Sequence, residues 1–196
     1  SMGNVWYNLT KINPLLKINL EPTDIGEALI LVNKDKSERT SIANLNMVSQ
    51  KPMISKSKWS HILYVNALSD TSFISDIKDG IVSVDICRGS VLKNLNVLRA
   101  VDFIFISDED IFTEVDNLIK LVRQAVILHH SGGSICYKKD GSKIETNVDI
   151  IDNINVLGCG DKLASYFISN YLDTNDIKKS IENSHKLVTK DLEESK

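Results

Sequence analysis

Short apolar runs alternate with segments of helical spacing between Trp59 and Leu128. A short apolar run predicts a buried strand, whereas apolar residues three or four positions apart predict an amphipathic helix. The predicted strands are His61–Val65, Ile81–Ile86, Asp102–Ile106 and Ala125–Leu128, and the predicted helices are Thr71–Lys78, Val91–Leu98 and Asp108–Arg123. Repeated strand–helix–strand units predict a mostly parallel sheet covered by helices, which is an α/β fold.

Polar turns predict a hairpin before this region and another after it. The first turn is Lys34–Ser37, and the second contains Asp140-Gly141, a pair that favours tight hairpin turns. The flanking strands are predicted at Ala28–Asn33 and Glu38–Ile42 for the first hairpin, and at Ser134–Lys138 and Lys143–Asn147 for the second.

Two amphipathic helices are predicted at the C-terminal end of the sequence. An apolar extended stretch, Ile150–Val156, leads into Gly158-Cys159-Gly160-Asp161, and a helix with apolar residues from Leu163 to Leu172 on one face follows. The last helix is predicted over Thr174–Asp191. Its acidic end, Asp191–Glu194, is expected to be solvated.

Composition and charge narrow the class of protein. Hydrophobic residues make up 42% and charged residues 25% of 196 residues, which suits a single globular domain over 1–196. The net charge of −3 and the absence of a basic stripe argue against a nucleic-acid surface. No apolar run approaches the roughly 20 residues that cross a bilayer, and no signal peptide is evident. Three widely spaced cysteines argue against a zinc site and fit a reducing compartment, so we expect a cytoplasmic protein.

The Gly158–Asp161 turn carries the candidate chemistry. Glycines permit positive φ and a close approach of the backbone to an anion. The first amide groups of a helix, together with its dipole, attract negative charge. Asp161 could cap the helix, or it could accept a proton from a hydroxyl held beside the anion. A phosphoryl group in transfer needs such an anion site and an oriented nucleophile.

The order of motifs resembles the ribokinase-like, or PfkB, family of carbohydrate kinases over residues 20–190. The stretch Asn155–Ile168 is similar to the family's Gly-Ala-Gly-Asp signature, in which an apolar strand leads into the turn and then a helix. The other similar segments are Ala28–Thr40, Val82–Arg88, Ala100–Asp110 and Val126–Tyr137, in the family's order. The resemblance implies a three-layer sandwich of helices around a mostly parallel sheet.

The resemblance also implies a kinase that uses ATP and Mg²⁺. Asp161 would take the proton from a sugar hydroxyl, and the backbone of Gly158, Cys159 and Gly160 would form the anion hole for the transferred phosphoryl group. Mg²⁺ would neutralise the phosphates, with a water-mediated contact from Asp110. The residues implied to contact the nucleotide are His130, Gly132, Gly133 and Asn183.

Several positions depart from the family pattern. The family's first strands and sugar-gripping Asp have no counterpart here, so the predicted sheet lacks the usual N-terminal strands, residues 1–20 form an extension, and the sugar site is unknown. Asp110 replaces a Glu, and His130 stands where the family has a Gly. Cys159 replaces an Ala and is expected to pack as a small apolar residue. Lys162 replaces a small residue, and it could contact phosphates or simply be exposed.

These departures leave three functions open. The first is an ATP-dependent kinase acting on a hydroxyl of a sugar or sugar-like substrate. The second is a degenerate relative that binds a nucleotide or a partner without catalysis. The third is a structural subunit of a larger complex, because a sheet without its usual edge strands exposes pairing groups. We expect a homodimer or a hetero-complex.

Overall fold

A computed structural model of the chain describes residues 4–12, 27–33, 38–44, 56–63, 65, 68, 70–86, 92, 94–151 and 157–194. The chain forms two compact units. One comprises Ser1–Asn46 with Thr146–Lys196, and the other comprises Met47–Glu145. The single domain predicted over residues 1–196 stays a prediction. Within the described ranges, no helix is long and apolar enough to span a bilayer.

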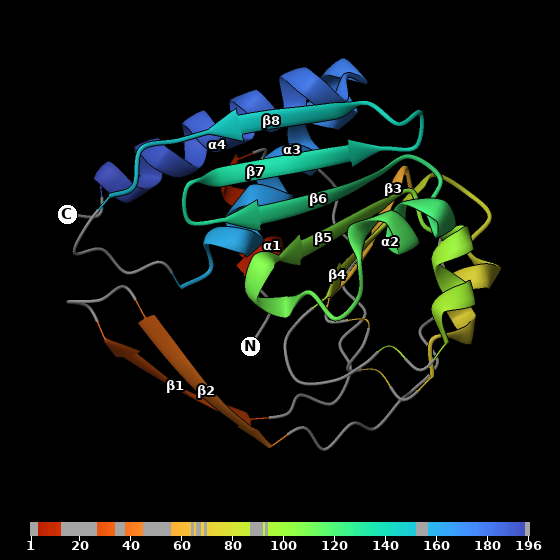
Figure 1. The fold of residues 1–196 in the computed structure, drawn as a ribbon, viewed down its shortest axis with the longest axis horizontal. Coiled ribbons are helices and arrows are strands. Elements are labelled where there is room, and N and C mark those ends of the chain that lie inside the picture. Colours follow the sequence, from red (N-terminus) through yellow and green to blue (C-terminus); the bar gives the residue numbers. More distant parts are fainter. Residues whose placement is uncertain are drawn as a thin grey trace. The chain divides into compact units, whose positions relative to one another are not determined.

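A six-stranded sheet has the order β3-β4-β5-β6-β7-β8 (Figure 1). Neighbouring strands from β3 to β6 are parallel, and β7 is antiparallel to β6. This arrangement confirms the predicted α/β fold with a mostly parallel sheet. The strands are β3 (Trp59–Ile62), β4 (Ile81–Ile86), β5 (Phe103–Ser107), β6 (Ala125–His130), β7 (Gly133–Lys138) and β8 (Lys143–Asn147).

Alternate residues of the sheet form one hydrophobic core with short helical segments. Val82, Val84 and Ile86 of β4 belong to this core, and so do Ile104 and Ile106 of β5. The core is closed by residues of η2 (Ser72–Asp76), η3 (Leu95–Ala100) and α2 (Val115–Leu121). The intervening Phe103 and Phe105 are buried as well. Burial of both faces explains why β5 is a continuous apolar run rather than an alternating one.

Asp102 joins the starts of three strands in this unit. Its Oδ2 accepts a hydrogen bond of 2.9 Å from the amide of Val82, and its own amide donates to the Val82 carbonyl. Its Oδ1 accepts from Nε2 of Gln124 at 3.3 Å, just before β6. Only 8% of Asp102 is exposed. A buried carboxylate therefore fixes the register of β4, β5 and β6 at one end.

The helical segments of the sheet unit (Met47–Glu145) are shorter than the spacing of apolar residues in the sequence predicts. The helix predicted over Thr71–Lys78 is the 3₁₀ segment η2, and the described part of the Val91–Leu98 prediction contains only the start of η3. The helix predicted over Asp108–Arg123 is wrong as one element: it divides into η4 (Asp108–Asp110) and α2. Ile111 and Glu114 between them are extended. Branched and aromatic residues at 111–113 lose side-chain freedom in a helix, which favours the break.

The other unit contains three helices and a two-stranded sheet. The helices are α1 (Asn4–Ile12), α3 (Cys159–Thr174) and α4 (Ile177–Glu193), and the strands are β1 (Glu27–Asn33) and β2 (Glu38–Asn44). Strand β1 pairs antiparallel with β2, as predicted, and the predicted turn between them lies outside the described residues. Helix α3 packs against both α1 and α4.

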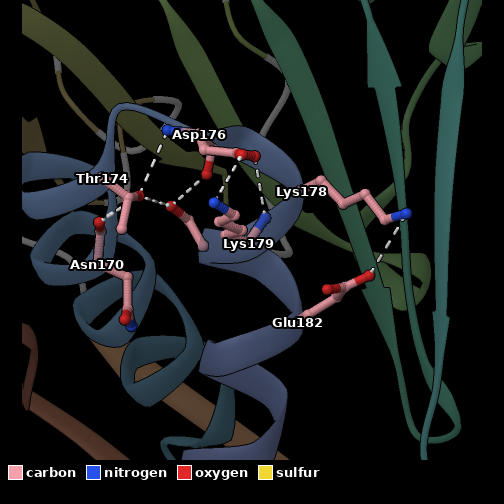
Figure 2. Close-up of polar contacts among 7 residues, drawn as sticks. Asn170, Thr174, Asp176, Lys178, Lys179 and Glu182 are labelled. Atoms are coloured by element: carbon pink, nitrogen blue, oxygen red, sulfur yellow. Dashed lines mark hydrogen bonds and ion pairs between the residues drawn. The ribbon is translucent and has the colours of Figure 1, made fainter.

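A sharp connection turns α3 back into α4 (Figure 2). Asn175 adopts the left-handed conformation with φ 52°. Oδ1 of Asp176 then caps α4 by accepting a 3.1 Å hydrogen bond from the amide of Lys179. Thr174 donates back to the carbonyl of Asn170 at 2.7 Å. The predicted last helix therefore begins three residues later than Thr174, because the chain needs these residues to reverse direction.

Candidate functional site

The Gly158–Asp161 turn opens α3 with a left-handed residue. Gly158 has φ 80° and occupies the N-cap position, and the helix begins at Cys159. A left-handed conformation costs an ordinary residue roughly 1–2 kcal/mol, and glycine avoids this cost because it has no Cβ. The positive φ that the sequence analysis expected of a glycine in this turn is found at Gly158. Gly158, Cys159, Gly160 and Asp161 are all half-buried. The turn therefore places the first main-chain amides of a 16-residue helix at half-buried positions.

Asp161 occupies the third position of α3 rather than its cap. The N-cap position falls on Gly158, which has no side chain to cap the helix. The capping role considered from the sequence is therefore wrong, because the helix begins two residues before Asp161. A carboxylate in the first turn still interacts favourably with the helix dipole. The Asp161 carbonyl accepts a 2.6 Å hydrogen bond from Oγ of Ser165.

Lys162 is held by the end of the next helix. Its Nζ lies 3.1 Å from Oδ2 of Asp191, and Oη of Tyr166 donates to the same oxygen at 2.8 Å. Burial raises the pKa of the Asp191 carboxyl, but the Tyr166 hydrogen bond and the Lys162 charge outweigh it, so the pKa is lowered overall. Burial, with the hydrogen bond to Asp191, raises the pKa of Tyr166. The sequence-based expectation of a solvated Asp191 is wrong.

His130, Gly132 and Gly133 come together where β6 turns into β7. Nδ1 of His130 accepts a 3.1 Å hydrogen bond from the amide of Gly132, so a neutral imidazole carries its proton on Nε2. A Cβ added to Gly132 would lie 3.5 Å from the His130 ring, in ordinary contact. Gly133 begins β7 with φ 137°. The imidazole thus stabilises its own turn, and a phosphate contact from it stays a prediction.

Asp110 follows β5 at the same edge of the sheet as His130. Strands β5 and β6 are parallel with Ser107 opposite His129, so their carboxyl ends coincide. Among the described residues, no group of three His, Cys, Asp or Glu side chains could hold a metal ion. Mg²⁺ that arrives with nucleotide phosphates usually keeps several waters and needs only one or two protein carboxylates. A single Asp110 fits that water-mediated role, which stays a prediction.

Asn183 lies in the same unit as Asp161 but farther along α4. Its side chain is half-buried. Because α4 rises about 1.5 Å per residue, Asn183 is roughly 12 Å along the helix axis from Asp191, the residue that contacts the start of α3. The structure therefore does not bring Asn183 next to Asp161, and its nucleotide contact stays a prediction.

Tyr166 and Asp191 lie beside Lys162, just after the turn, and neither residue was predicted as its neighbour from the sequence. Tyr166 follows Lys162 by four residues, and this spacing places both on one face of a helix. This spacing could be recognised in the sequence, and it indicates that the Lys162 cation and the Tyr166 hydroxyl share a partner. The partner itself, 29 residues after Lys162, follows only from the reversal between α3 and α4.

Comparisons with known proteins identify the fold. No protein-family model matches the sequence, and no curated protein matches it. Ribokinase from Thermotoga maritima superposes with a TM-score of 0.64 at 16% identity, over 83% of this chain and 61% of that one. The nucleoside kinase of Methanocaldococcus jannaschii gives 0.54 at 21%, over 82% and 58%. A fructokinase double mutant from Vibrio cholerae, with fructose, ADP and potassium bound, gives 0.59 at 16%, over 82% and 64%.

The chain spans about 60% of the length of these structures. All three are kinases by name, and two have names that place them in the ribokinase group. The sheet order, the Gly158 turn and these superpositions agree on one architecture. The chain has the ribokinase-like α/β fold.

Proposed function

We propose that this chain is an ATP-dependent phosphotransferase that acts on a hydroxyl of a sugar or sugar-like substrate. The observation that supports the proposal is the left-handed Gly158 opening α3, with Asp161 in the first turn of that helix. The ribokinase-like fold and the kinase names of its structural neighbours support the same reaction class.

In the proposed reaction, the turn provides the electrostatic stabilisation and Asp161 provides the base. The main chain of Gly158–Gly160 faces the transferred group and stabilises charge on its oxygens. The substrate hydroxyl oxygen forms a bond to the γ-phosphorus while the bond from that phosphorus to the bridging oxygen breaks, and ADP leaves. The carboxylate of Asp161 accepts the hydroxyl proton.

The family resemblance further suggests residues for nucleotide and metal contacts. Mg²⁺ would neutralise phosphate charge, and Asp110 would hold one of its waters. His130, Gly132 and Gly133 are proposed to line the nucleotide from the β6–β7 turn. Asn183 is proposed to border its base.

The test is a substitution that removes the base and preserves its size. Turnover is measured with ATP and Mg²⁺ against ribose, fructose and a nucleoside, the acceptor classes suggested by the neighbours' names. We expect Asp161→Asn to lower kcat by about 100- to 10,000-fold, the usual contribution of a general base. Asp173→Asn is the matched control, because Asp173 is exposed at the far end of the same helix.

Nucleotide binding separates the proposal from its alternatives. A thermal shift with ATP and Mg²⁺ should persist in Asp161→Asn, since ligand binding to the folded state raises the melting temperature by mass action. A shift without turnover on any acceptor would instead support a degenerate nucleotide-binding protein. If the protein shows neither a thermal shift nor turnover, the result would favour a structural subunit. Equal turnover in Asp161→Asn and wild type would refute Asp161 as the base.

A further inference from the structure

Two residues of one face of α3 converge on a single carboxylate oxygen of α4. Lys162 and Tyr166 are four positions apart, and both contact Oδ2 of Asp191, at 3.1 Å and 2.8 Å. The side chains of Lys162 and Asp191 are 26% and 20% exposed. A partly buried ion pair that also accepts a hydroxyl hydrogen bond is stronger than an isolated surface pair. The end of α4 is thus attached to the start of α3.

A second contact attaches the same helical turn to α1. Oγ of Ser165 is fully buried, and it lies 2.6 Å from the carbonyl oxygen of Asp161 and 3.3 Å from that of Val5. Val5 is itself buried in the packing between α1 and α3. The start of α3 is therefore held from two sides, by the Ser165 hydroxyl against the main chain of α1 and by the ion pair of Lys162 with α4.

The charged contact also determines what Lys162 can do. A lysine directly after Asp161 would otherwise be free to move toward a bound phosphate, because its four-carbon stem is flexible. Nζ instead lies against Asp191, with the amide of Lys162 bonded to the Gly158 carbonyl at 2.9 Å. The charge of Lys11 in α1 further favours the ionised form of Asp191. The positive charge of Lys162 is thus balanced by the carboxylate of Asp191 within the same unit.

We propose that Asp191 is a positioning residue for the Gly158–Asp161 turn, holding Lys162 away from phosphate and fixing the first turn of α3. This inference rests on the proposed function for its catalytic consequence only. If Asp191 holds the turn, its loss frees the Lys162 charge and loosens the helix start. A freed lysine would bind phosphate more tightly in a less productive geometry, so kcat and the KM for ATP should fall together.

The first experiment needs no catalysis. Hydrogen exchange of the amides at residues 162–165 is compared in wild type, Asp191→Ala and Tyr166→Phe. We expect about tenfold faster exchange in Asp191→Ala and a smaller increase in Tyr166→Phe, since local opening becomes easier when a charge-assisted hydrogen bond is lost. Glu193→Gln, an exposed acid two residues away in α4, should leave exchange unchanged. Tyr166→Phe keeps the ion pair, so it reports even where Asp191→Ala does not fold.

The second experiment measures the kinetic consequence. Asp191→Asn should lower kcat about tenfold and lower the KM for ATP, and adding Lys162→Met should restore the KM by removing the freed charge. Unchanged exchange at residues 162–165 in both Asp191→Ala and Tyr166→Phe would overturn the inference, whatever the kinetics. Faster exchange in a protein that shows no turnover would support the positioning role and refute the proposed function, so the two failures are distinguishable.

Discussion

His61 in β3 should make the folding stability of the protein fall in mild acid. Its Nδ1 lies 2.7 Å from Oγ of Ser83, and that oxygen also accepts a 2.7 Å hydrogen bond from Nε1 of Trp59. The edge of the imidazole meets the ring of Phe105, with centroids 5.9 Å apart. Within the described ranges, Nε2 is sealed from solvent and has no hydrogen-bond partner. Burial lowers the pKa of His61 to about 4.

The sign of the effect follows from proton binding in the two states. The unfolded chain binds a proton at His61 near its ordinary pKa of about 6.5, whereas the folded chain resists it until about pH 4. Stability is therefore fully present above pH 6.5 and is lost as the pH falls toward 4. Going from pH 7.5 to pH 5, these two values give a loss of about 2 kcal/mol. Because the side chain as a whole is only half-buried, we expect about 1.5 kcal/mol.

Urea unfolding of wild type and His61→Gln at several pH values between 5 and 7.5 measures this difference directly. The variant should be less dependent on pH, so the free-energy difference between the two proteins should change by about 1.5 kcal/mol across the range. Trp59→Phe is the control, because it removes a hydrogen bond to Ser83 but no titrating group. It should lower stability by a constant amount. Parallel pH profiles for wild type and His61→Gln would refute the argument.

Two further predictions concern the sheet unit. Asp102→Ala should lower the free energy of unfolding by about 2–3 kcal/mol, because it leaves the buried amide of Val82 without its partner, and chemical denaturation should show a smaller loss for Asp102→Asn. Gly80→Ala should destabilise by more than about 2 kcal/mol, since its φ is +78° and an added Cβ would lie 2.7 Å from the Lys58 carbonyl carbon. Gly141→Ala, with φ +85° but open space, should cost only the backbone strain, so equal melting temperatures for the two alanine variants would contradict the steric argument.

Local signals in the sequence predicted the elements of the sheet but not their helical connections. The apolar runs of β4, β5 and β6 are long enough and β-branched enough to specify buried strands. The segment from Asp108 to Arg123 has apolar residues at helical spacing, three or four positions apart, and yet the chain is extended at Ile111. Spacing records which residues become buried, and an extended connection can bury the same residues as a helix.

The candidate site shows a different limit of local reasoning. Gly158 was recognised because its conformation depends on one residue type, and the structure gives it a positive φ. The position of Asp161 in the helix depended on where the helix begins, which sequence patterns locate only to within a few residues. His130 was considered as a phosphate neighbour because of its place in a motif, whereas its Nδ1 bonds the amide of Gly132.

Lys162 shows why a departure from a family pattern need not indicate lost chemistry. Considered alone, a lysine beside Asp161, the proposed base, would alter the charge of the proposed anion site. In the folded unit, the end of α4 supplies Asp191, whose carboxylate forms an ion pair with Lys162. The compensating residue is distant in sequence and adjacent in space because α3 and α4 run in opposite directions. Lys162 and Asp191 should therefore be interpreted as one feature. The coupling between the two residues is measured with the double variant Asp191→Asn and Lys162→Met, rather than with either single variant alone.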